Sequence, residues 1–89
     1  MSVKTNKPTD QVGIEIRSEK VCRAGETVLR TTAVMRVMRH YHQTRATAEK
    51  IVARMMARNI LVYEKNIGTT SDIPGYTVEE PKTFFFVEK

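Results

Sequence analysis

The sequence predicts an α+β fold, with helices in the middle of the chain and strands toward its carboxyl end. Between residues 31 and 58 the apolar residues recur every three or four positions, which is the period of an amphipathic helix. In segments 60–65 and 82–88, β-branched and aromatic residues indicate strands instead. A chain of 89 residues, 40% of them hydrophobic, can form one modest core, so we expect one domain.

We expect residues 1–8 to be a flexible N-terminal arm and residues 9–89 to form the domain. The arm is polar, contains two lysines and ends in proline. The sequence has no apolar run long enough to span a bilayer and no signal-peptide pattern, so we expect no membrane partner. Its single cysteine, Cys22, fits a reducing compartment, and these features together favour a cytoplasmic protein.

Residues 9–23 allow two interpretations. The polar residues at positions 9 and 10 can cap a helix in which Val12 and Ile16 lie one turn apart. The apolar residues from Val12 to Ile16 also alternate as in a strand, and Gly13 weakens a helix. We favour a helix here and keep the strand as the alternative.

The first clear helix follows a turn at residues 24–26 and a short extended segment at 27–30. Thr31 or Thr32 is expected to cap this helix, which runs to about Tyr41. Its apolar side consists of Val34, Val37, Met38 and Tyr41. Three basic or polar residues are expected to point away from this side, namely Arg36, Arg39 and His40.

A polar connection, residues 42–45, separates this helix from a second one at about 46–59. Thr44 is the expected cap and Asn59 the expected end, because asparagine tolerates the left-handed conformation. The buried stripe of the second helix should be Ala48, Ile51, Val52 and Met55. The opposite side should carry Ala46, Lys50, Ala53, Arg54 and Ala57. Four methionines are expected to pack where the helices meet: Met35, Met38, Met55 and Met56.

The two predicted strands, 60–65 and 82–88, are expected to pair as an antiparallel hairpin. The segment between them, 66–76, contains glycine, proline and small polar residues and reads as a loop. Residues 77–78 can extend the second strand inward, with Pro81 interrupting it. The phenylalanines at 84–86 are expected to supply hairpin core and one exposed ring.

Positive charge is concentrated in residues 30–58. This segment contains seven basic residues and one acid, a net charge of +6, whereas the whole chain has a net charge of +5. The charges alternate with apolar residues at helical spacing, so we expect them on the surfaces of folded helices. A basic folded surface attracts polyanions, and nucleic acid is the polyanion that we expect.

The predicted order from residue 28 to residue 87 is helix, polar turn, helix, strand, loop and strand. In segment 50–63 (KIVARMMARNILVY) a helix runs through the turn-forming Asn59 directly into a strand. By this order and this segment the chain resembles the winged helix-turn-helix family, and it is weakly similar to the Ren exclusion proteins of lambdoid phages. The resemblance implies a small winged helix-turn-helix domain that binds DNA, with the hairpin as its wing.

The same helices suit duplex DNA on physical grounds. The major groove of DNA admits one α-helix. Small residues where the helix comes closest to the bases, with cationic residues beside them, favour this docking. Threonines near the helix start can contact phosphates or base edges. The residues that we expect to contact double-stranded DNA are Arg36, Arg39, Thr44, Arg45, Thr47, Lys50 and Arg54.

The predicted function is therefore that of a small DNA-binding protein, a transcription or replication regulator of the phage, plasmid or mobile-element type. A homodimer is a possible form, with contacts through residues 9–23 or the hairpin. The sequence has no paired carboxylates, nucleophile–base pair or phosphate-binding glycine loop, so we expect no enzymatic activity, no cofactor and no small-molecule substrate. His40 and His42 have no further ligands nearby and are expected to be surface residues.

Two alternatives remain open at this stage. Segment 66–80 has acids and no basic residue, unlike a typical DNA-binding wing, so the hairpin and the phenylalanine strand could instead bind a host protein. If residues 12–17 form a strand, the order strand–helix–helix resembles the ribbon-helix-helix repressors, in which paired strands of a dimer enter the groove.

Overall fold

The computed structural model describes residues 13–68 and 72–87, which form a small α+β domain with two α-helices and two antiparallel sheets. The predicted arm 1–8 and residues 9–12 lie outside the described part. In chain order the elements are β1 (Gly13–Arg17), the 3-10 turn η2 (Ser18–Lys20), β2 (Val28–Leu29), α1 (Arg30–Tyr41), α2 (Arg45–Ala57), β3 (Val62–Ile67), β4 (Ile73–Thr77) and β5 (Thr83–Val87).

Residues 13–17 form strand β1, so the helix favoured for this segment is wrong and the alternating pattern was the correct signal. Ile16 is fully buried and Ile14 packs against the same core. β1 pairs antiparallel with β5 of the same chain, with Gly13 opposite Val87. The backbone of β1 is therefore satisfied by a strand from the far end of the chain, and local helix propensity does not decide its conformation.

The expected hairpin is also wrong in its pairing. β3 pairs with β4, and all of β4 except Thr77 lies in the segment that we expected to be a loop. The second predicted strand, β5, belongs to the other sheet. Gly75, which reads as a turn residue, sits instead in the middle of the sheet β2–β4–β3, where an added Cβ atom would lie 2.5 Å from the Ile67 side chain. Close packing, and not a turn, requires this glycine.

α1 begins at Arg30 with Leu29 in the capping position, so the expected cap at Thr31 or Thr32 is wrong. The chain passes directly from β2 into the helix, and Leu29 makes no side-chain capping hydrogen bond. α1 ends where His42 adopts a left-handed conformation (φ 55°) and its amide bonds the Met38 carbonyl. This tight end allows α2 to start at Arg45.

α2 agrees closely with its prediction. Its four predicted stripe residues, Ala48, Ile51, Val52 and Met55, are all fully buried. Asn59 has φ 57°, the left-handed conformation expected at the helix end. The methionine prediction holds only in part: Met38 and Met56 pack against the core, but Met35 is 50% exposed.

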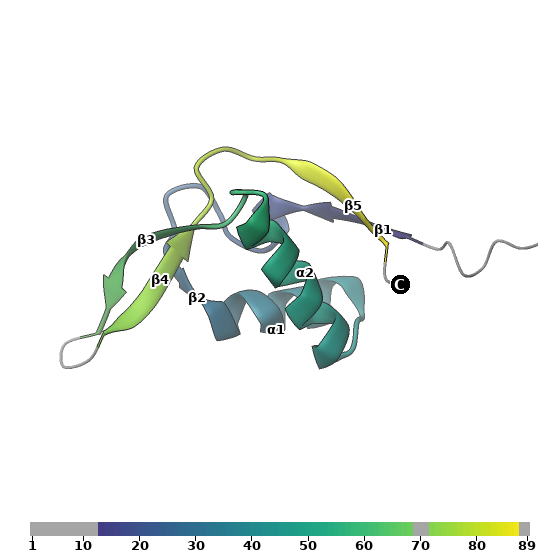
Figure 1. The fold of residues 1–89 in the computed structure, drawn as a ribbon, viewed down its shortest axis with the longest axis horizontal. Coiled ribbons are helices and arrows are strands. Elements are labelled where there is room, and N and C mark those ends of the chain that lie inside the picture. The colour runs from purple at the N-terminus through teal and green to yellow at the C-terminus, as the bar shows by residue number, and fades with distance from the viewer. Residues whose placement is uncertain (1–12, 69–71, 88–89) are drawn as a thin grey trace, which may run out of the picture.

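The two sheets lie on different sides of the helix pair (Figure 1). The β3–β4 hairpin extends away from the helices on one side, whereas the ribbon of β1 and β5 lies on the other, near α2. Phe84 and Phe86 on β5 are buried in the common core, and Phe85 between them is 59% exposed. The expectation of core phenylalanines plus one exposed ring is thus confirmed, although they belong to the ribbon.

Candidate nucleic-acid interface

The exposed surface of α2 is a helix face with small residues at its centre and cations at its edges. Ala46, Ala53 and Ala57 are exposed, as are Arg45 and Lys50. At 100° per residue the alanines occupy the middle of the exposed arc, Arg45 lies toward one edge, and Lys50 and Arg54 lie toward the other. The backbone of α2 is therefore accessible between two rows of long side chains.

Thr44 caps the start of this helix, as expected. Its Oγ1 accepts a hydrogen bond from the Thr47 amide at 3.3 Å. Thr47, which we expected at the interface, is only 8% exposed and its hydroxyl lies 3.2 Å from that of Thr44. Of the two threonines, only Thr44 is exposed to a ligand, and Thr47 helps to fix the first turn.

Two substitutions of Thr44 test its role as the cap of α2. Thr44→Ala removes the cap and is expected to lower the free energy of unfolding by about 1 kcal/mol. Thr44→Asp retains a capping oxygen and places a negative charge at the helix start, so its stability should equal that of the wild type or exceed it slightly. Urea denaturation of both variants measures the difference. Equal losses in the two variants would contradict the capping role.

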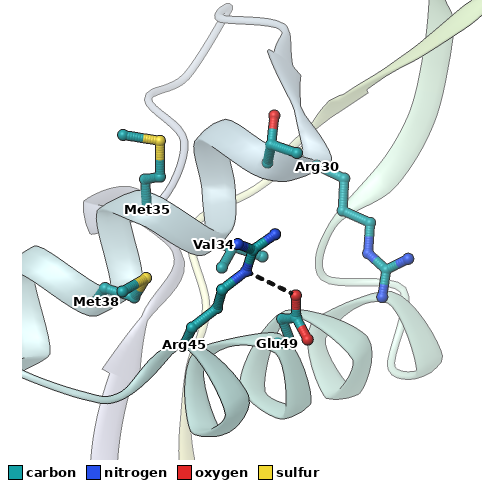
Figure 2. Close-up of a pocket in the computed structure, with 7 residues that line it drawn as sticks. Arg30, Val34, Met35, Met38, Arg45 and Glu49 are labelled. Carbon is teal, nitrogen blue, oxygen red and sulfur yellow. Dashed lines mark hydrogen bonds and ion pairs between the residues drawn. The ribbon is translucent and has the colours of Figure 1, made fainter.

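A groove lies between α1 and α2, on the Arg45 side of the exposed arc. Its lining includes Met35 and Met38 on α1 and Arg45 and Glu49 on α2, and Figure 2 shows these residues around it. Arg45 forms an ion pair with Glu49 at 3.2 Å, with the arginine side chain 74% exposed. The acid offsets part of the arginine charge, so this edge of α2 is less positive than the sequence alone indicates.

A second groove lies between α2 and β5. It is lined by Lys50, Ala53, Arg54, Ala57, Phe85, Phe86 and Val87. The Arg54 guanidinium lies 5.7 Å from the centre of the Phe86 ring, and that of Arg58 lies 5.6 Å from the centre of the Phe84 ring. These cation–π contacts hold two arginines along the strand while leaving both residues exposed.

Arg36 does not point away from the protein, contrary to the expectation. Its guanidinium donates two hydrogen bonds of 2.8 Å to the Glu26 carboxylate and one of 3.0 Å to the Val21 carbonyl. Hydrogen bonding by Arg36, reinforced by the Arg23 amide, lowers the pKa of Glu26 from 4.5 to about 2. Arg36 therefore ties α1 to the turn before β2, whereas Arg39 and His40 are exposed as expected.

The seven predicted contact residues thus do not share one surface. Lys50 and Arg54 lie together in the α2–β5 groove, and Arg45 lies at the opposite edge of the same helix. Thr44 is exposed at its start and Arg39 is exposed on α1. Arg36 and Thr47 have structural partners instead.

No protein-family model, curated protein or solved structure matches the chain. The function therefore has to be argued from the geometry of its own residues.

Other kinds of site have little support in the described part of the chain. Within residues 13–68 and 72–87, no group of three or more histidine, cysteine, aspartate or glutamate residues is placed to hold a metal ion. No helix among those residues is long and apolar enough to cross a membrane. Cys22 is fully buried, and burial raises the pKa of its thiol, so it is poorly suited to act as a nucleophile.

Two features of the candidate site and its surroundings could not be found from the sequence. The β5 wall of the second groove was missed because β5 was assigned to the wrong hairpin. The run of three phenylalanines indicates a strand in the sequence, but it does not identify the partner of that strand. The Glu26 partner of Arg36 lies ten positions away, at a spacing that has no periodic signature.

Proposed function

We propose that the protein binds double-stranded DNA through the exposed face of α2. The observation that carries this proposal is that exposed alanines lie between cationic side chains on one surface of α2. The start of this helix is capped by Thr44. A helix of this kind can approach base edges with its backbone while its long side chains reach the phosphates on either side. Arginine is well suited to this task because its planar guanidinium pairs with guanine or phosphate through two hydrogen bonds.

In this docking, α2 enters the major groove and α1 lies across the DNA backbone. Ala46 and Ala53 approach the bases, Arg45, Lys50 and Arg54 contact phosphates or base edges, and Arg39 contacts a flanking phosphate. Arg36 and Thr47 are left out because their partners lie within the protein. The three-residue connection 42–44 between the helices is of the length that helix-turn-helix motifs use.

We further propose that the fold is a winged helix, with β3–β4 as the wing. The order β2–α1–α2–β3–β4 and the antiparallel β3–β4 pair support this assignment. A regulator of the phage, plasmid or mobile-element type, acting by occupying its DNA site, is the role that fits a small domain of this kind. A homodimer would supply two such helices to a two-fold-symmetric site.

The alternative role, capture of a host protein by a hairpin carrying the phenylalanine strand, has less support. The hairpin and that strand belong to different sheets, and Phe84 and Phe86 are buried. The ribbon-helix-helix alternative is also weakened, because β1 is paired with β5 of its own chain.

The proposal is tested by fluorescence anisotropy with a random-sequence DNA duplex at several salt concentrations. Each phosphate neutralised contributes about −0.9 to the slope of log affinity against log salt, so Lys50→Ala should make the slope shallower by about that amount. Thr44→Asp should weaken binding without loss of stability, because its carboxylate repels phosphates. Lys20→Ala, which removes an exposed charge on η2, is the matched control and should leave the slope unchanged. Absence of binding at micromolar protein and low salt would contradict the proposal.

A further inference from the structure

The groove between α2 and β5 combines two features that differ from a plain helix surface. One wall is the cationic edge of α2, with Lys50 and Arg54, and the other wall is β5. No acidic residue is among the described residues that line it. Phe85, which belongs to the β5 wall, is 59% exposed.

The Phe85 ring lies against a glycine on the neighbouring strand. An ideal Cβ atom at Gly13 would lie 2.0 Å from the ring, so any other residue there would displace the ring. The ring thus packs on the Gly13 backbone while the residue stays 59% exposed. An aromatic ring supported on one side and open on the other is a ready platform for stacking.

We propose that this groove binds a single-stranded or locally unpaired nucleic acid, with phosphates between Lys50 and Arg54 and one base stacked on Phe85. The proposal rests on nucleic-acid binding by α2, and it adds that the side of α2 facing β5 binds the single-stranded form. Sites for single strands combine a cationic groove for the backbone with aromatic rings for the bases. Phe85 lines the same groove as Lys50 and Arg54, and its ring lies against Gly13 on the adjacent strand, so a nucleotide whose phosphate lies in the groove can place its base on the ring.

Charge and position favour a nucleotide over a peptide as the occupant. Glu15 lies opposite Phe85 on β1, and it is paired with Arg17 at 3.4 Å. An acidic peptide added to the edge of β5 would use Lys50 and Arg54, but it would leave the Phe85 ring without a function. A nucleic acid uses both.

The test compares labelled oligothymidylate with an abasic oligomer of equal length and with the duplex. Wild-type protein should bind oligothymidylate more tightly than the abasic oligomer. Phe85→Ala should reduce oligothymidylate affinity about tenfold, because loss of one stacked base has an effect of that order. It should change affinity for the abasic oligomer little. Phe85→Tyr keeps the aromatic face and should restore binding.

Two further variants separate the contribution of the cationic α2 wall from that of the Phe85 ring. Lys50→Gln should make the salt slope for the single strand shallower by about 0.7. Gly13→Ala displaces the ring without removing it, so it should weaken oligothymidylate binding in a protein whose thermal unfolding shows it to be folded. Phe85→Ala, at an exposed position, provides a measurement that does not depend on how β1 accommodates a new side chain at Gly13.

The outcomes distinguish this proposal from the proposed function. Duplex binding together with equal affinity for oligothymidylate and the abasic oligomer would overturn the single-strand site and leave duplex binding standing. Oligothymidylate binding that depends on Phe85, without duplex binding, would support this site and overturn the duplex proposal. Binding of an acidic peptide but no oligomer, or no binding of any probe, would overturn both.

Discussion

Phe86→Ala is expected to lower the free energy of unfolding by about 3–5 kcal/mol. Phe86 is only 2% exposed and lies on the inner face of β5, and the Arg54 guanidinium lies over its ring. Its truncation removes a large apolar side chain from the contact between the ribbon and the rest of the core, and leaves a cavity. For a domain with a typical total stability of about 5–15 kcal/mol this is a major loss. Chemical denaturation at neutral pH measures it.

The matched control is the neighbouring residue on the same strand. Phe85→Ala removes the same number of atoms from an exposed position, so the free energy of unfolding should change by about 1 kcal/mol or less. Similar losses in the free energy of unfolding for Phe85→Ala and Phe86→Ala would contradict the burial of only one face of β5. A loss below about 1 kcal/mol for Phe86→Ala would mean that the ribbon contributes little to the core.

Glu26→Gln is expected to lower the free energy of unfolding at neutral pH by about 1 kcal/mol, the order appropriate to a partly exposed pair with two good hydrogen bonds. The pKa of the Glu26 carboxyl is about 2 in the folded protein and 4.5 in the reference state. Because the folded pKa is lower, the stabilisation is fully present above pH 4.5 and is lost as the pH falls toward 2. The difference between wild type and Glu26→Gln should therefore close over this range.

Urea denaturation of both proteins at several pH values provides the measurement. Glu19→Gln changes an exposed acid on η2 and should show no such convergence. A difference between wild type and Glu26→Gln that stays constant down to pH 2 would show that the ion pair with Arg36 is not its source.

The parts of the fold that the sequence predicted are those controlled by neighbours along the chain. The buried stripe of α2, the Thr44 cap and the left-handed Asn59 each depend on residues within a few positions. A helix satisfies its own backbone, so its pattern alone is enough to identify it. The exposed face of α2 follows from the same pattern, and this is the part of the candidate site that sequence could predict.

The parts that failed depend on partners far away in the sequence. β1 reads as a helix or a strand until β5 is placed beside it. The strand β4 reads as a loop because Gly75 and Pro74 are typical of turns, yet Gly75 is needed where the Ile67 side chain crosses it. Arg36 lies on the polar side of α1 by its period, and only the fold brings Glu26 to it. Strand pairs and ion pairs between residues far apart in the chain produce no periodic pattern in the sequence.

The pairing of β1 with β5 also has a consequence for how the protein folds. Gly13 lies opposite Val87, so this contact closes nearly the whole described chain into a loop, and such long-range closure slows folding. α1 and α2 are joined by a short connection and can meet before the ribbon forms. During synthesis the apolar side of β1, including Ile16, has no strand to pair with until residues 83–87 have emerged. We therefore expect the nascent chain to expose this strand edge until synthesis reaches β5.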